Sequence, residues 1–226
     1  MNRLPEGIRL PLLKKLIMKT KLLLILTFLG CISFFKTRAQ TNINVDPEKW
    51  TSYNCEATFY RGSIHVMNTA DKSAALWLKN LNFKNGTVEL DIKGKDLRGE
   101  SFVGIAFHAS DDEHYAAIYF RPFNFKDPER KGRSVQYVDI PGHDWDALRE
   151  RNPGKYENEV NPVPDPNDWF HARIVISFPE IKVYVNDSKE PSLIVHELNK
   201  RGEGKFGLWI DGIEGWFNNV VLSETN

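Results

Sequence analysis

The chain has 226 residues and balances 30 lysines and arginines against 30 aspartates and glutamates, so its formal net charge is zero at pH 7. Eight of the basic residues and one of the acidic residues fall within residues 1–39, so residues 40–226 carry 22 basic and 29 acidic side chains. No cluster of Lys and Arg interleaved with aromatic residues occurs, which excludes the nucleic-acid-binding class, and we expect no nucleic-acid partner.

The first 39 residues have the pattern of an export signal. Four lysines precede an apolar run at 22–35: Lys14, Lys15, Lys19 and Lys21. The run has about 14 residues, fewer than the roughly 20 that a membrane-spanning helix needs. Small residues then lead to Ala39 and Gln40, so we predict a signal peptide over 1–39 that is cleaved between these two residues. The protein would be secreted or periplasmic with no membrane span after cleavage, and Met18 is an alternative start.

Strand-like runs of alternating apolar and polar residues fill most of the remaining chain. They lie at 57–60, 63–67, 74–79, 86–93, 102–108, 114–122, 133–139, 169–177, 181–186, 192–196, 205–211 and 216–223. Turn signals separate them and helical periodicity is nearly absent, which predicts an all-β fold of two packed antiparallel sheets in a single domain over 40–226. Cys55 is the only cysteine in that range, so no intramolecular disulfide and no cysteine-based zinc site is expected.

The alternation also predicts which side chains form the shared core. We expect it to include Val88, Leu90, Ile105, Phe107, Ile118, Phe120, Ile174, Ile176, Val183, Val185 and Leu208. In the run 114–122 the remaining positions share the solvated face: Tyr115, Tyr119 and Arg121. In the run 102–108 the residues on this face are Gly104, Ala106 and His108. The small side chains of the first two leave a hollow. A hollow beside tyrosines and an arginine suits a polar ring such as a sugar, although tyrosines also occupy half-exposed strand positions for packing alone.

The segment 140–168 interrupts this pattern. It carries five prolines, and only 144–151 has the pattern of a short helix, with Asp144 as its cap. Connections this long within a compact domain are commonly binding loops or lids. We expect the loop to fold over one edge of the outer face and to bring His143 and Trp145 toward Tyr119 and Arg121.

Several of these runs, in this order, resemble concanavalin A-like lectin and glucanase domains, most closely the 3-keto-disaccharide hydrolase or laminin-G-like branch. The matching segments are 86–91, 104–107, 115–122, 135–137, 167–170, 182–186, 207–209 and 216–219. The resemblance covers nearly all of the chain from Trp50 onward. It implies a jelly-roll sandwich whose concave sheet binds a carbohydrate, which is the one partner that we expect. Such a superfamily includes both enzymes and binding modules, so the fold alone does not decide the activity.

Two functional classes stay open. A glucanase of the family 16 type would carry Glu-x-Asp-x-x-Glu on one strand, but here Glu89 and Asp91 are followed by Gly94, so the acid is missing. The 3-keto-disaccharide resemblance instead implies elimination, in which a base removes the proton at C2 and the glycosidic oxygen leaves. The alternative is a non-catalytic carbohydrate-binding or adhesion module.

We assign candidate roles on this basis. The candidate catalytic residues are His108, Arg121 and His143, with His114 and Glu157 nearby in the proposed site. The candidate substrate-binding residues are Glu89, Asp91, Tyr115, Tyr119, Arg121, Gln136, Tyr137 and Trp145. No cofactor and no metal site is expected, with a divalent cation left open, because the acidic turn at 111–113 is too small to supply the roughly six to eight oxygens that calcium takes.

Overall fold

The computed structural model describes residues 40–43 and 46–225. The predicted signal peptide and its cleavage after Ala39 lie outside the described residues. Within the described part of the chain, no helix has both the length and the apolar character needed to cross a membrane.

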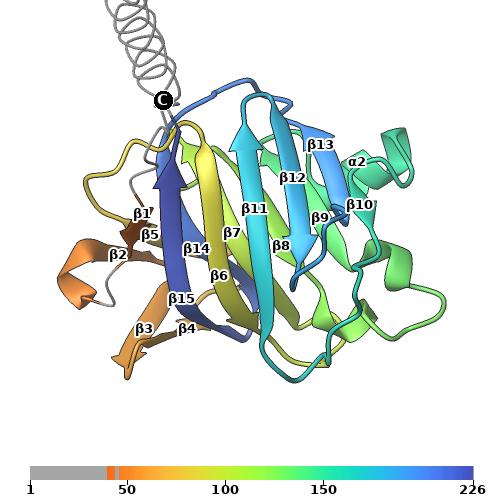
Figure 1. Cartoon of the computed structure of the whole chain (residues 1–226), viewed down its shortest axis with the longest axis horizontal. Helices are drawn as coiled ribbons and strands as arrows, with labels where there is room; N and C mark the ends of the chain where they lie inside the picture. The colour runs from red at the N-terminus through yellow and green to blue at the C-terminus, as the bar shows by residue number, and fades with distance from the viewer. Residues whose placement is uncertain (1–39, 44–45, 226) are drawn as a thin grey trace, which may run out of the picture. The chain divides into compact units, whose positions relative to one another are not determined.

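The described residues form two antiparallel sheets that pack face to face, with the strands of one in front of those of the other in Figure 1. The eight-stranded sheet follows the order β13 (Leu193–His196), β12 (Glu180–Val185), β11 (Phe170–Ser177), β6 (Gly86–Lys93), β15 (Glu214–Glu224), β4 (Ser63–Asn68) and β3 (Cys55–Tyr60), with β1 (Gln40–Asn42) paired to β15 beside this path. The seven-stranded sheet follows the order β10 (Glu157–Asn158), β9 (Val135–Ile140), β8 (Tyr115–Phe120), β7 (Ser101–Ala109), β14 (Lys205–Gly212), β5 (Ala74–Leu78) and β2 (Trp50–Tyr53). The predicted all-β sandwich is confirmed.

The core lies between the two sheets, as the alternation along the strands requires. All eleven residues predicted for it are buried, with relative exposures of 0–1%. The pairing of β7 with β8 places Ile105 opposite Ile118, and the pairing of β7 with β14 places Ile105 opposite Leu208. The predicted register of the central strands is therefore correct.

A bulge interrupts the pairing of β7 with β14. Ala106 pairs with Gly207 and Ala109 with Lys205, so two residues of β7, Phe107 and His108, face the single residue between them on β14. His108 has a positive φ of 49°, which few residues other than glycine adopt. The extra residue ends the strict alternation of side chains at this point.

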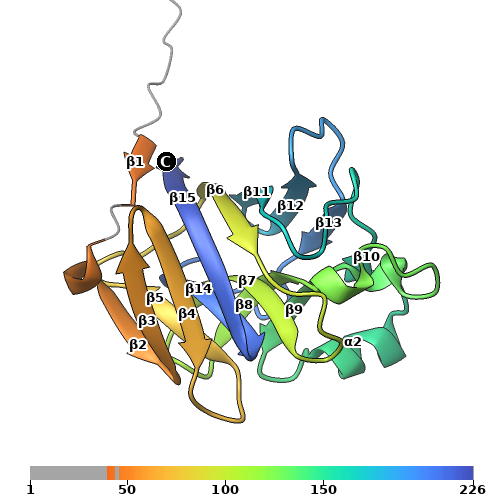
Figure 2. The same ribbon diagram turned by 90° about the horizontal axis from the view of Figure 1, so that it is seen from below.

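The long loop after β9 has structure of its own. It contains α2 (Trp145–Arg151), with Asp144 as N-cap, followed by the two-residue strand β10, which pairs with β9. The predicted helix is therefore confirmed, whereas β10 was not predicted. Figure 2 shows α2 beside β9, and the buried side chain of Leu148 anchors it. Three short 3-10 helices complete the fold: η1 (Pro47–Lys49), η2 (Pro122–Asn124) and η3 (Lys131–Arg133).

Candidate functional site

The outer face of the seven-stranded sheet carries a pocket of about 610 Å³. Its floor is formed by side chains of β8, β9 and β14 that alternate with the core residues of those strands. Its walls come from the turn before β7, the segment from η2 to η3, and the start of α2. The residues that line it include Ser73, Arg98, Phe102, Tyr115, Tyr119, Arg121, Arg130, Arg133, Asp144, Trp145, Asp146, Arg149, Trp209 and Asp211.

A hydrogen-bonded cluster lies at the floor of the pocket. Nη2 of Arg121 donates to the hydroxyl of Tyr119 at 2.8 Å and to Oε1 of Gln136. The Tyr119 hydroxyl also donates to Gln136 Oε1 at 3.3 Å, and Gln136 Nε2 donates to the backbone oxygen of Trp145 at 3.3 Å. Burial raises the pKa of Tyr119 and lowers the pKa of Arg121. The cluster therefore fixes the guanidinium beneath the pocket before any ligand arrives.

The aromatic floor is more enclosed than the sequence suggested. Tyr119 is only 3% exposed, so the prediction that its side chain lies on a solvated face is wrong. The cause is a ring contact: Gly104 pairs with Tyr119 on one side and Trp209 on the other, and the two rings meet with centroids 4.9 Å apart. A Cβ at Gly104 would collide with the backbone oxygen of Ile118, so no larger residue fits there.

One buried carboxylate holds the arginine-rich side of the pocket together. Glu157, on β10, accepts hydrogen bonds from Nε and Nη2 of Arg149 at 2.8 Å and 2.5 Å. Its oxygens also lie 3.7 Å from Nη1 of Arg121 and 3.9 Å from Nε of Arg133. This arrangement ties α2 to β10 and joins the wall of the pocket to its floor.

A second carboxylate lies elsewhere in the lining. Asp211 Oδ2 accepts a hydrogen bond from the Ser73 hydroxyl at 3.3 Å, and Oδ1 accepts from the backbone N–H of Gly212 at 2.8 Å. Burial raises its pKa above the ordinary aspartate value. Tyr115 lies nearby, with its hydroxyl accepting from Nε1 of Trp209 at 3.3 Å, and burial raises the pKa of this tyrosine too. The pocket therefore contains a partly desolvated carboxylate as well as arginines.

Several predicted site residues are brought together here. Tyr115, Tyr119, Arg121 and Trp145 all line the pocket, and Gln136 is hydrogen-bonded to three of their groups. The expectation that the long loop places Trp145 over this face is confirmed.

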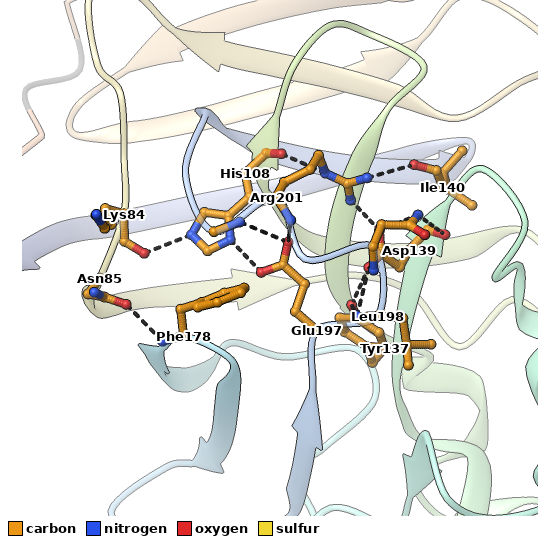
Figure 3. Close-up of polar contacts among 12 residues, drawn as sticks. Lys84, Asn85, His108, Tyr137, Asp139, Ile140, Phe178, Glu197, Leu198 and Arg201 are labelled. Atoms are coloured by element: carbon orange, nitrogen blue, oxygen red, sulfur yellow. Dashed lines mark hydrogen bonds and ion pairs between the residues drawn. The ribbon is translucent and has the colours of Figure 1, made fainter.

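The predicted position of His108 is wrong. Its side chain is wholly buried instead of lying on the outer face, because the bulge in β7 turns it inward. Its Nε2 donates to the backbone oxygen of Lys84 at 2.7 Å, and its Nδ1 lies 2.6 Å from Oε2 of Glu197 (Figure 3). Arg201 donates to the backbone oxygen of His108 at 2.9 Å and pairs with Asp139 in the same buried network.

Other predicted residues also lie away from the pocket. Tyr137 points to the core side of β9, where its hydroxyl donates to Asp139 at 2.7 Å. His143 is not part of the pocket lining, and its backbone N–H and oxygen both bond to Asp139. It is half-buried at the turn before α2.

The two carboxylates predicted from the glucanase pattern belong to the other sheet. Glu89 and Asp91 lie on β6, where they alternate with the buried residues Val88 and Leu90, so their side chains face away from the core on the eight-stranded sheet. The Asp91 carboxylate contacts Nδ1 of His171 at 2.8 Å. They do not share a binding site with Tyr119, because the pattern along one strand does not tell which sheet the strand joins.

Among the described residues, no group of three or more His, Cys, Asp or Glu side chains is arranged to hold a metal ion. In the acidic turn after β7, Asp111 accepts from Nδ1 of His114 at 2.7 Å and Asp112 pairs with Lys205 at 3.2 Å.

The sequence reasoning did not identify Arg149, Trp209 and Asp211 as site residues. Trp209 and Asp211 follow Leu208 on β14, and because Leu208 was already placed in the core, alternation puts both on the pocket face. Arg149 follows Trp145 by one turn of α2, which places the two side chains on one face of the helix, with the guanidinium 5.0 Å from the Trp145 ring.

Comparison with known proteins places this geometry in context. Residues 40–223 match the family described as the 3-keto-alpha-glucoside-1,2-lyase-like domain. No curated protein sequence matches the chain.

Three solved structures illustrate the similarity of the fold. The carbohydrate binding module CBM66 from Bacillus subtilis has a TM-score of 0.57 at 18% identity, covering 78% of this chain and 96% of that one. A protein of unknown function with a galectin-like fold, also from Bacillus subtilis, has a TM-score of 0.56 at 13% identity, covering 81% and 92%. The exoplasmic/lumenal domain of VIP36, in its Ca²⁺/Man3GlcNAc-bound form, has a TM-score of 0.53 at 13% identity, covering 83% and 88%. At these identities the likeness concerns the fold alone.

Proposed function

This chain belongs to the 3-keto-alpha-glucoside-1,2-lyase-like domain family, and from that premise we propose that it binds a glycoside in the pocket and cleaves its 3-keto form by elimination. The observation that carries the proposal is the pairing of two kinds of group in one pocket. Asp211 supplies a partly desolvated carboxylate, and Arg121 supplies a fixed guanidinium among aromatic side chains.

The proposed reaction breaks the glycosidic bond without water in its first step. A base takes the proton from C2, which the neighbouring C3 carbonyl acidifies, and negative charge develops on the carbonyl oxygen. The electron pair then forms the double bond between C1 and C2 while the bond from C1 to the glycosidic oxygen breaks. The departing oxygen takes up a proton, so the products are an unsaturated 3-keto sugar and the free leaving alcohol.

We assign the role of base to Asp211. A carboxylate whose pKa is raised by burial is a stronger base than an ordinary one, which is the property that the step requires. The same group, once protonated, can return its proton to the departing oxygen. His108 does not reach the pocket, and so we no longer propose it for this role.

We assign the role of stabilising the developing enolate oxygen to Arg121, as the sequence suggested. Its hydrogen bonds to Tyr119 and Gln136 hold the guanidinium in place, so little reorganisation is needed when charge develops. Trp145, which is 49% exposed at the pocket wall, offers an aromatic surface for the sugar ring.

The experiment that tests this function compares a glycoside with its 3-keto derivative. Incubation with the protein should release the leaving alcohol from the 3-keto glycoside and leave the parent glycoside intact, because only the ketone acidifies C2. Release of the alcohol and the unsaturated sugar is followed by mass spectrometry against a sample without protein. Binding of both compounds without release of either would instead indicate a non-catalytic carbohydrate-binding module.

We also propose that the protein acts outside the cytoplasm after removal of residues 1–39. The lysines and the apolar run of this segment support the proposal. Mass spectrometry of the native protein should find Gln40, or a residue within about two positions of it, at the N-terminus. Material that starts at Met1 or Met18 would contradict the signal peptide.

A further inference from the structure

Five arginines line the pocket: Arg98, Arg121, Arg130, Arg133 and Arg149. Among the described residues, only two carboxylates lie within ion-pair distance of any of them. Glu157 lies within this distance of Arg121, Arg133 and Arg149. Asp127 pairs with Arg130. The five arginines therefore carry three more charges than the two carboxylates within that distance.

The remaining acidic residues of the pocket do not offset this excess directly. Asp144 and Asp146 are exposed at the start of α2, and neither makes an ion pair within the described part of the chain, although the charge of Asp146 contributes to raising the pKa of Arg149. Asp211 is hydrogen-bonded to Ser73 and Gly212. Three arginines, Arg121, Arg133 and Arg149, converge on one shared carboxylate, Glu157.

Like charges crowd one another on this side of the pocket. The neighbouring guanidinium groups of Arg149 and Arg133 add to the effect of burial in lowering the pKa of Arg121. Arg130 has a buried Nε without a hydrogen-bond partner among the described residues, although its Nη2 pairs with Asp127. A buried donor without a partner is costly.

We propose that the glycoside bound in this pocket is anionic, carrying a carboxylate or a sulfate that the converging arginines receive. The inference rests on the proposed function, because it names the class of substrate for the same site. The aromatic rings of Phe102, Trp145 and Trp209 in the same lining suit a sugar ring, whereas a free inorganic anion would make no use of them. The planar guanidinium groups match the two oxygens of a carboxylate, which favours a sugar acid over a sulfate ester.

The test uses unreactive glycosides, so that no enolate forms and only recognition of the ground state is measured. Binding of p-nitrophenyl glucoside, p-nitrophenyl glucuronide and the 6-sulfate of the glucoside to the full chain is measured by isothermal titration calorimetry. We expect one of the two anionic compounds to bind at least about tenfold more tightly than the neutral one, and this preference to shrink between 50 and 200 mM NaCl, in the manner of screened charges. The tighter of the two anionic ligands identifies the source of the charge.

Arg133 offers the matched variant, because its side chain is 48% exposed and its loss should leave the fold intact. Arg133→Gln should lower the ratio of the anionic to the neutral glycoside's affinity severalfold. The control is Arg173→Gln on β11 of the other sheet, where the guanidinium lies over the ring of Tyr184, and it should change neither affinity.

The outcomes separate this inference from the proposed function. Equal affinity for the neutral and anionic glycosides, together with cleavage of the neutral 3-keto glycoside, would overturn the inference and leave the function standing. Failure of every glycoside to bind, with no cleavage of a 3-keto glycoside, would overturn both.

Discussion

Asp211 is placed in an environment that favours chemistry over stability. It is a carboxylate in the pocket floor, with one hydroxyl and one backbone N–H as its hydrogen-bond donors. Because burial raises its folded-state pKa above the unfolded value, the stability it contributes is fully present below the unfolded pKa and is lost as pH rises through the folded pKa. At neutral pH its ionised form therefore works against the folded state, which is common for groups retained for function.

Asp211→Asn should separate the two effects. We expect turnover of a 3-keto glycoside to fall by about 10²–10⁴-fold, the usual range for loss of a general base, while glycoside affinity is kept. The variant should melt at pH 7 at the same temperature as the parent or higher, and this advantage should vanish in acid, where the parent's carboxyl is protonated. Full turnover in the variant, or a lower melting temperature at pH 7, would contradict the assignment. Asp187→Asn, at an exposed turn after β12, is the control.

At the scale of elements, α2 shows how a short helix can serve the fold and the site with different residues. Leu148 is 2% exposed and anchors the helix against the sheet, whereas Trp145 is 49% exposed at the pocket wall. The helix was predictable because Asp144 precedes a segment without prolines. The strand β10 was not, since two residues are too few to show alternation, and it supplies Glu157, which fixes Arg149 in place.

Substitutions of Trp145 and Leu148 should affect different properties, ligand binding and stability. Trp145→Ala should weaken glycoside binding by about tenfold or more, because a stacking surface is lost, with little change in thermal stability. Leu148→Ala should lower the free energy of unfolding by about 2–4 kcal/mol, because it opens a cavity beneath the helix. Calorimetric titration and urea denaturation measure the two quantities. If Trp145→Ala binds as the parent does, the sugar ring lies elsewhere in the pocket.

The element scale also explains which parts of the site the sequence could predict. Tyr115, Tyr119 and Arg121 follow from alternation within one strand, which is a local property. The arginines around Glu157 and the carboxylate of Asp211 come from segments that are far apart in the sequence and meet only through sheet order. Sheet order also separates Glu89 and Asp91 from the pocket, and nothing in the sequence of β6 shows which sheet this strand joins.

At the scale of the molecule, a buried polar network joins the two sheets. Glu197 follows β13 of the eight-stranded sheet, and it contacts His108 on β7 of the seven-stranded sheet. Arg201, in the same connection, bonds to the backbone of His108 and to Asp139 on β9. The fold class could be predicted from the strand pattern. The buried polar network could not, because it depends on one extra residue in β7.

A pair of histidine substitutions tests the structural role of this network. His108→Ala should lower the free energy of unfolding by about 3–5 kcal/mol, because it removes one partner of a buried charged group. His114→Ala is the matched control, since its Nδ1 contacts a carboxylate at nearly the same distance, 2.7 Å against 2.6 Å, on the exposed surface. The free energy of unfolding of the His114→Ala variant should match that of the parent, because exposed ion pairs contribute little to stability. Urea denaturation measures the stability of both variants. Equal losses of stability would show that the burial of His108 adds nothing to the strength of its contact.

The walls of the pocket and its floor belong to different parts of the architecture. Trp145 and its exposed neighbours Asp144 and Asp146 lie at the start of α2, whereas Tyr119 and Arg121 are held by the sheet and its core. Directed evolution can exploit this division. A library randomised at the three exposed positions should yield clones that remain folded at high frequency and differ in the glycosides they bind. The sandwich therefore offers a scaffold on which new specificities can be selected without first engineering extra stability.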